Sequence, residues 1–163
     1  MVFTGHFHSQ DIAGRSHGKK KIYDIETGSI VSYPSPYRFV TLQGNRLDIR
    51  TCHIESIPGS SDTSLAPYAR RFAADGLTTI IKTMLPAKVS EDCMSRVCDV
   101  MATAYVAHLA GDEVITPVEE ENIKKACRSL RHYSWKYAFI LKHLAKNLWT
   151  DLPPQDNNLT IHL

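Results

Sequence analysis

The sequence predicts an α+β fold in which short strands come first and helices follow. Up to residue 57, apolar and polar residues alternate with the two-residue period of half-buried strands. After residue 64 the apolar residues recur every three or four positions, which is typical of amphipathic helices. Residues 58–64, Pro-Gly-Ser-Ser-Asp-Thr-Ser, separate these patterns and favour a loop. We therefore expect a strand domain over residues 1–58 and a helical domain over residues 59–163.

The composition is that of an ordinary globular chain. Of its 163 residues, 43% are hydrophobic and 22% are charged. The net charge of +2 is too small to indicate binding to nucleic acid or to a membrane surface. The sequence contains no run of 18 apolar residues and no signal-peptide pattern at its N-terminus. We expect a cytoplasmic chain with neither nucleic acid nor a membrane as partner.

The first strand leads directly into a pair of histidines. Apolar residues 2 and 3 are followed closely by Gly5-His6-Phe7-His8. Gly5 permits a tight turn at the strand end, and the imidazoles of His6 and His8 are ligands that suit zinc, manganese or iron. A solvated or hydrogen-bonded strand end is the alternative for the pair taken alone. A strand at the very start of a chain has no sheet behind it, so we expect further sequence upstream.

Residues 9–20 are rich in glycine and polar residues and predict a loop. If the histidines bind a metal, His17 and the lysines at 19–21 would lie beside it and could meet a substrate phosphate. A solvated loop with a small charge cluster is the interpretation that we favour. The next strand begins at Ile22 and ends in the turn Thr27-Gly28-Ser29.

A hairpin is predicted from strands 37–42 and 46–57, which flank Gln43-Gly44-Asn45. Pro34 and Pro36 mark an exposed loop before it. Arg38 is the one charged residue just past these prolines. It is suited to anchor the turn at Gly28 or to contact a substrate phosphate, and anchoring is the safer interpretation.

Three helices are predicted after the boundary: residues 64–84, a helix capped by Ser90 and ended by Gly111, and a helix that runs from Thr116 to about Trp149. Thr116-Pro117-Val118-Glu119 is a capping box with proline at the first helical position. The three can pack as a small bundle. The predicted apolar stripe of the first helix consists of Leu65, Ala69, Phe72, Gly76 or Leu77, Ile80 and Met84.

Several other features of the helical part invite a functional interpretation. The histidines at 108, 132 and 143 lack a carboxylate at ligand spacing, so we interpret them as residues at a bundle edge. The basic stripe formed by Lys124, Arg128, Arg131, Lys142 and Lys146 is interpreted as a solvated face rather than a nucleic-acid site. The four cysteines show no Cys-x-x-Cys spacing and predict buried thiols. In the tail, residues 159–163 alternate and predict an edge strand or docking on the bundle, with polar low complexity as the alternative.

The succession of Gly5-His6-Phe7-His8, a strand and the Gly28-Ser29 turn resembles the C-terminal end of the calcineurin-like metallophosphoesterases. The resemblance covers about residues 2–57. It implies that His6 is a ligand of the metal also held by the family's Asn and middle His. It implies that His8 is a ligand of the metal held by the family's Asp-x-His motif. Two divalent transition metals, manganese, iron or zinc, would then hydrolyse phosphate mono- or diesters.

The chain departs from this family because its upstream motifs, Gly-Asp-x-x-Asp and Gly-Asn-His, are not in the sequence. Without a bridging carboxylate two cations cannot be held close together, and two imidazoles are too few for a tight site. We therefore expect a C-terminal part of a hydrolase with no complete catalytic set, at most one weakly bound metal, and weak substrate contacts from His17 and Arg38. The alternative is a non-catalytic helical interaction or oligomerisation module, with self-association through an exposed sheet.

Overall fold

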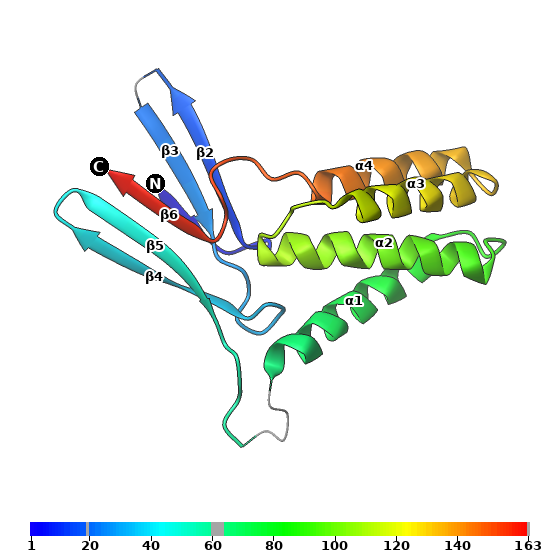
Figure 1. Ribbon diagram of the computed structural model, residues 1–163, viewed down its shortest axis with the longest axis horizontal. Coiled ribbons are helices and arrows are strands. Elements are labelled where there is room, and N and C mark those ends of the chain that lie inside the picture. Colours follow the sequence, from blue (N-terminus) through cyan, green and yellow to red (C-terminus); the bar gives the residue numbers. More distant parts are fainter. Residues whose placement is uncertain (19, 60–63, 163) are drawn as a thin grey trace. The chain divides into compact units, whose positions relative to one another are not determined.

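A computed structural model describes residues 1–18, 20–59 and 64–162 of the chain (Figure 1). This part of the chain contains six strands and four helices, which confirms the α+β class. It divides into two compact units. The strand unit comprises Met1–Arg70, His108–Asp112 and Asp151–Leu163, and the helical unit comprises Arg71–Ala107 and Glu113–Thr150.

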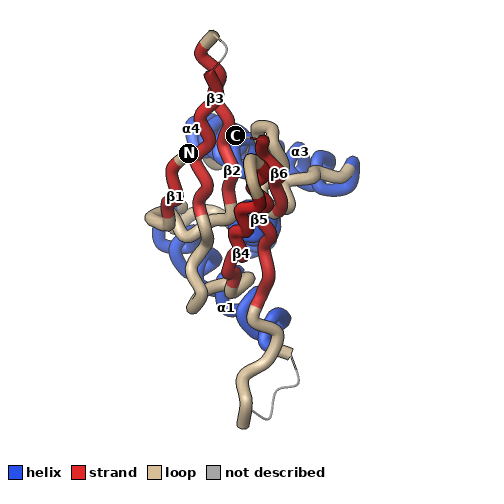
Figure 2. The backbone as a smooth tube through the Cα atoms, turned by 90° about the vertical axis from the view of Figure 1, so that its left-hand side faces the viewer, coloured by secondary structure: helices blue, strands red, loops and turns tan. Residues whose placement is uncertain are grey.

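The strands of the first unit form two small sheets (Figure 2). The first has the order β1-β3-β2, with β1 parallel and β2 antiparallel to β3. The second has the order β4-β5-β6 and is antiparallel throughout. The strand bounds are β1 (Val2–Thr4), β2 (Asp11–His17), β3 (Lys20–Glu26), β4 (Pro36–Gln43), β5 (Arg46–His53) and β6 (Asn158–His162).

The predicted loop over residues 9–20 is wrong, because β2 occupies its centre. All seven residues of β2 pair with β3, and Ile12 is fully buried opposite Ile25. β2 lies at the edge of the sheet, and its last four residues are exposed. Their composition, Gly-Arg-Ser-His, is similar to that of a loop. Pairing with β3 thus decides a structure that local composition does not indicate. Lys19 lies outside the described residues.

The second sheet confirms the predicted hairpin and settles the alternatives for the tail. Gly44 has a φ of 60°, the left-handed value that its tight turn needs. The tail forms β6 along β5, with Leu159 opposite Ile49 and Ile161 opposite Leu47. The last residues therefore pack with the strands, and the strand unit is assembled from segments that are distant in sequence. Residues 60–63 of the predicted boundary lie outside the described residues.

The core of the strand unit is small and extends onto exposed edge strands. Ile12, Ile25, Leu47 and Ile49 are buried together. Leu42 on β4 pairs with Leu47, so the two side chains share the inner face, yet Leu42 is 59% exposed. Phe3 on β1 likewise lies beside Ile25 and is 50% exposed. Each inner sheet face thus carries apolar surface that the described residues leave uncovered.

The helical unit contains four helices in its described residues, so the predicted three-helix module is wrong in number. They are α1 (Leu65–Met84), α2 (Glu91–Ala110), α3 (Pro117–Arg131) and α4 (Trp135–Leu148). The start of α1, up to Arg70, and the end of α2, from His108, belong to the strand unit. The helix expected to reach Trp149 breaks after Arg131. Ser134 adopts extended backbone and its hydroxyl accepts a hydrogen bond from the Tyr137 amide at 3.4 Å, which starts α4. The two helices run side by side in Figure 1.

The predicted apolar stripe of α1 is also partly wrong. Phe72 is 70% exposed, and Ile80 and Met84 are exposed as well. Ile81 is buried and Leu77 packs against the helical core. One residue changes the direction of a helical side chain by about 100°. Because α1 carries apolar residues on two faces, periodicity could not identify the buried one.

The other helical predictions agree with the structure. Ser90 caps α2 through a hydrogen bond from the Cys93 amide, and Thr116 and Glu119 form the predicted capping box of α3. All four cysteines have free thiols, and those of Cys93, Cys98 and Cys127 are buried in the helical core. Burial raises the pKa of each of these three thiols, which makes them less reactive. None of the helices in the described residues is long and apolar enough to cross a membrane.

Candidate functional site

The two predicted metal ligands lie on the loop that joins β1 to β2. Gly5 follows the last residue of β1, and the loop runs to Gln10. His6 and His8 are exposed, whereas Ser9 and Gln10 are buried. The loop therefore presents both imidazoles to solvent from a base that is fixed in the strand unit. We call residues 5–10 the histidine loop.

The start of the histidine loop is held by the end of β3. The Phe7 amide, between the two histidines, donates a hydrogen bond to Glu26 Oε1 at 2.5 Å. The Thr27 amide donates to the Thr4 carbonyl at 3.0 Å. On the strand itself, the Thr4 hydroxyl donates to Asp24 Oδ1 at 2.8 Å. Three contacts from one segment thus fix the backbone on which the histidines stand.

The Gly28 turn packs against the same loop. The Gly28 amide donates to Gln10 Oε1 at 2.7 Å. A Cβ atom on Gly28 would lie 3.2 Å from the His8 carbonyl oxygen and 2.9 Å from Pro36 Cγ, so a side chain does not fit without a shift. The two parts of the family resemblance, separated in the chain by β2 and β3, therefore touch each other in the structure.

Gln10 is a fully buried polar residue that the sequence analysis missed. Its Nε2 donates to Thr51 Oγ1 at 2.9 Å and to Asn157 Oδ1 at 3.5 Å, and its amide donates to the Leu109 carbonyl at 3.2 Å. It therefore connects the histidine loop with β5 and the C-terminal segment. Its position directly after two histidines and a serine gave no signal for burial, because glutamine is usually exposed.

His8 adopts a left-handed backbone conformation with φ of 62°. For a residue with a Cβ atom this conformation costs about 1 kcal/mol. The close approach of Gly28 to the His8 carbonyl and the bond from Gly28 to Gln10 hold the neighbouring backbone in place. Strained backbone of this kind is concentrated at functional sites. The preceding side chain, Phe7, contacts the His6 ring edge to face, with ring centroids 5.4 Å apart.

The described residues do not contain a complete set of metal ligands. Within residues 1–18, 20–59 and 64–162, no three His, Cys, Asp or Glu side chains are grouped so that they could hold an ion. Catalytic zinc usually takes three protein ligands and structural zinc takes four. The histidine loop offers two imidazoles, which is fewer than either kind of zinc site takes.

His17 is not brought together with the histidine loop. It pairs with Lys20 at the tip of the β2–β3 hairpin, whereas Asp11 pairs with Glu26 beside the loop (Figure 1). At about 3.3 Å per residue, the stretch of β2 from Asp11 to His17 spans roughly 20 Å. A phosphate at the histidine loop would be out of reach of His17.

Arg38 binds the C-terminal segment. Its Nη2 donates to the Asp156 carbonyl at 2.7 Å, and Asp156 Oδ1 in turn accepts from the Ile12 amide at 2.8 Å. Burial lowers the pKa of the Arg38 guanidinium, while the carboxylates of Asp156 and Asp11 oppose that change. Nε and Nη1 of Arg38 are buried with no hydrogen-bond partner in the described part of the chain. These contacts make Arg38 an anchor of the C-terminal segment, whereas the sequence analysis expected it to anchor the turn at Gly28.

The histidines and the basic stripe of the helices have contacts that are typical of helix ends and helix surfaces. His132 caps the end of α3, and the His143 ring lies on Phe139 with centroids 4.2 Å apart. His108 lies in the last turn of α2. In the basic stripe, Lys124 pairs with Glu120 at 3.5 Å and Arg128 pairs with Glu121 at 3.7 Å. Both pairs are solvated, as on an ordinary helix surface.

Comparisons with known proteins do not bear on the family of the chain. Searches against protein-family models and against curated proteins find no match. The resemblance to metallophosphoesterases therefore rests on the histidine loop and the Gly28 turn, and it stays a prediction.

Proposed function

We propose that this chain is the C-terminal part of a metal-dependent phosphohydrolase that cleaves phosphate mono- or diesters at a two-metal site. The observation that carries the proposal is the packing of the Gly28 turn on the histidine loop. This packing leaves His6 and His8 exposed on a backbone that is fixed on both sides. A loop of this kind holds two ligands ready for a metal without a large ordering cost.

In this proposal His6 and His8 each contribute one imidazole nitrogen, and each ligates a different ion. The paired ions, when bound, would bind the phosphate and activate a water molecule. The chain's own contribution is positioning. Glu26 holds the peptide between the two histidines, and Gln10 holds the loop base against Gly28. Such supporting contacts commonly change metal affinity or activity by about 10- to 100-fold.

The remaining ligands, among them a bridging carboxylate, would come from a part of the enzyme that precedes these strands in the family pattern. The uncovered inner faces support this step. Phe3 on β1 and Leu42 on β4 expose apolar side chains beside buried partners. Further strands of a larger sandwich would cover such surface and pair with the open edges. The isolated chain is then expected to hydrolyse nothing.

The test begins with the reading frame upstream of the Met1 codon. The proposal predicts an open frame that encodes Asp-x-His, Gly-Asp-x-x-Asp and Gly-Asn-His motifs. The longer protein should hydrolyse p-nitrophenyl phosphate or bis-p-nitrophenyl phosphate with Mn²⁺. His6→Ala and His8→Ala should each lower kcat/KM by at least about 100-fold, since they remove metal ligands themselves. His17→Ala is the matched control and should keep full activity.

Full activity of His6→Ala in the longer protein would show that the metal assignment is wrong. An in-frame stop codon and a ribosome-binding site next to Met1 would contradict the proposal that this chain is part of a longer phosphohydrolase. The function would then have to be sought in the helices.

A second candidate is a non-catalytic interaction or oligomerisation module. The observation that favours it is the outer face of α4, where Trp135 is 73% exposed and Phe139, Ile140 and Leu144 are exposed as well. Exposed apolar groups of this size mark contact surfaces more often than single exposed residues do. Sedimentation of the chain over a range of concentrations tests this function. Phe139→Glu should abolish association through α4, and Leu42→Glu should abolish association through the sheet; a monomer at all concentrations would contradict both.

A further inference from the structure

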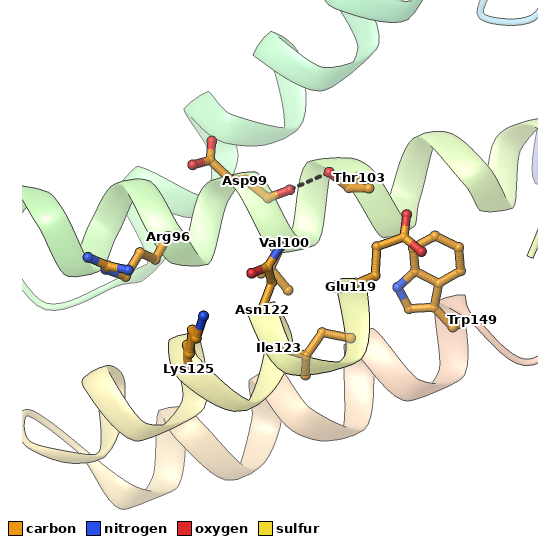
Figure 3. A pocket seen from close by; sticks show the side chains of 9 residues that line it. All are labelled: Arg96, Asp99, Val100, Thr103, Glu119, Asn122, Ile123, Lys125 and Trp149. Atoms are coloured by element: carbon orange, nitrogen blue, oxygen red, sulfur yellow. Dashed lines mark hydrogen bonds between the residues drawn. The ribbon is translucent and has the colours of Figure 1, made fainter. Parts of the chain in front are cut away.

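A pocket with a volume of about 270 Å³ lies within the helical unit, between α2, α3 and the residue that follows α4 (Figure 3). This volume suits a small metabolite, since it lies just below the usual range for drug-sized ligands. No motif in the sequence indicates this site. It is lined by Arg96, Asp99, Val100, Thr103, Glu119, Asn122, Ile123, Lys125 and Trp149.

Apart from Asp99, the charged side chains that line the pocket lie at two ends according to their sign. Figure 3 shows Arg96 and Lys125 at one end and Glu119 beside Trp149 at the other. Lys125 and Glu119 stand six positions apart on α3, a rise of about 9 Å along the helix. The floor between the two ends includes the apolar side chain of Ile123. The pocket therefore has a basic end, a middle that combines apolar Val100 and Ile123 with the amide of Asn122, and an acidic aromatic end.

The basic end combines a fixed cation with an available one. Arg96 donates from Nε and Nη2 to the two carboxylate oxygens of Asp92, each at 2.9 Å, so its guanidinium is held in one orientation. Lys125 has neither an ion pair nor a hydrogen bond from its ammonium group within the described residues. An anionic group of a ligand can therefore bind Lys125 without displacing a partner.

The acidic end is suited to a cation. Glu119 Oε2 accepts a hydrogen bond from the Thr116 amide at 2.6 Å, which fixes the carboxylate, and no described residue donates to its Oε1. The Trp149 indole lies beside this carboxylate (Figure 3). An ammonium group between a carboxylate and an aromatic ring is stabilised by both. The other acidic side chain, Asp99, points toward α1 and away from α3 in Figure 3.

We propose that this pocket binds a small dipolar molecule whose anionic and cationic groups are separated by an extended aliphatic chain, such as an ω-amino acid. The anionic group binds at Lys125 and Arg96, and the ammonium group binds at Glu119 and Trp149. The aliphatic chain lies on Ile123. An α-amino acid, with its charges one carbon apart, is too short to reach both ends. This site is independent of the metal proposal and lies entirely within one compact unit.

The experiment titrates 6-aminohexanoate into the full chain and follows amide and indole signals by NMR. We expect saturable binding with a Kd on the order of 1 mM, typical for a ligand with so few atoms. The largest shifts should occur at Lys125, Glu119 and the Trp149 indole. Glycine, hexanoate and hexylamine serve as probes that lack the charge separation or one charge. Each should bind at least about tenfold more weakly.

Two variants test the contribution of each end of the pocket to binding. Lys125→Met keeps the aliphatic stem, and Glu119→Gln keeps the capping box because glutamine can replace glutamate there. Each should weaken 6-aminohexanoate binding about tenfold. Lys124→Met is the matched control, since Lys124 is paired with Glu120 outside the pocket, and it should change nothing. Circular dichroism verifies that each variant folds.

Two results would overturn the proposal. One is binding of hexanoate or hexylamine as tight as that of 6-aminohexanoate, because the pocket would then not recognise a separated pair of charges. The other is unchanged affinity in folded Lys125→Met and Glu119→Gln. Absence of any shift at up to about 50 mM ligand, far above the expected Kd, would equally contradict it.

Discussion

The strand unit and the helical unit keep their structure by different means. The helical unit has an extensive apolar core, to which α1, α2, α3 and α4 all contribute and in which Leu130, Ala126 and Ala145 are almost completely buried. Among the described residues of the strand unit, the buried apolar cluster consists of four residues. Buried polar groups, Gln10 and Asp156, connect its sheets and its C-terminal segment. The helical unit is thus held by packed apolar side chains, whereas hydrogen bonds of a few buried polar groups connect the parts of the strand unit.

This difference has a consequence for function. The helical unit is held by its apolar core, and the charged pocket side chains Lys125 and Glu119 lie outside that buried cluster. The strand unit places its most specific contacts directly beneath the histidine loop, where Gln10 and Glu26 hold the backbone. The loop that we propose to bind metal is therefore the part whose geometry is most closely tied to individual polar residues.

The largest expected effect tests the helical core. Leu130→Ala, at a residue 1% exposed, should lower the free energy of unfolding by about 3 kcal/mol, because it leaves a cavity among packed helices. Urea unfolding followed by circular dichroism measures the change. Leu144→Ala on the exposed side of α4 is the control and should cost less than about 1 kcal/mol. Equal costs for the two variants would contradict the assigned core.

The second prediction tests the polar contacts of the strand unit. Gln10→Ala should lower the free energy of unfolding by about 2 kcal/mol, since it leaves the buried Gly28 amide without its acceptor. Amide hydrogen exchange at Gly28 should also become faster. Gln155→Ala, at an exposed position in the tail, is the matched control and should change neither quantity. A Gln10 variant as stable as the control would mean that apolar contacts alone hold this unit.

A smaller effect is expected at the start of α3. Thr116→Ala removes one half of the capping box and should cost about 1 kcal/mol. Thr116→Ser should recover most of the lost stability, because a hydroxyl oxygen is again available to accept a hydrogen bond from the Glu119 amide. Thr79→Ala, whose hydroxyl bonds only to a carbonyl within α1, should cost clearly less. If Thr79→Ala costs as much as Thr116→Ala, the cap makes no special contribution.

The smallest effect concerns pH and the strand unit. Hydrogen bonds from Thr160 and then Arg46 lower the pKa of Asp48, which lies opposite Thr160 in the β5–β6 pair. Because the folded pKa is below the unfolded one, the ionised form contributes stability above the unfolded pKa. That contribution is lost as pH falls through the folded pKa. Thr160→Val should raise the pKa of Asp48 in an NMR titration, and an unchanged pKa would contradict the assigned bond.

The sequence predicted those elements whose signals are local. The cap at Ser90, the capping box at Thr116 and the tight turn at Gly44 each depend on neighbouring residues, and all three are in the structure. β2 could not be predicted in this way, because its pairing with β3 and the burial of Ile12 involve contacts that composition does not show. The break before Ser134 had a signal, a serine able to cap, which the continuing apolar stripe outweighed.

For the candidate site, sequence identified the exposed histidines but not their supports. His6 and His8 were singled out by the pattern Gly5-His6-Phe7-His8 together with the later Gly28-Ser29 turn, and metal binding by them stays a prediction. Gln10 and Glu26 act through distant partners, and a glutamine or glutamate in a polar stretch has many possible roles. The pocket in the helical unit was missed for a related reason, because its charged residues come from two helices and each looks like an ordinary surface residue by itself.

The most direct test of the proposed function is a titration of the chain with Zn²⁺, with the histidine ring signals followed by NMR. Because the described residues offer no third ligand, the proposal predicts that in this chain His6 and His8 together bind one ion weakly, with both rings perturbed and His17 unchanged. Binding should disappear in His6→Ala and in His8→Ala and should persist in His17→Ala. Zn²⁺ binding that survives His6→Ala, or that leaves the His6 and His8 rings unperturbed, would contradict the assignment of the histidine loop as a metal-binding segment.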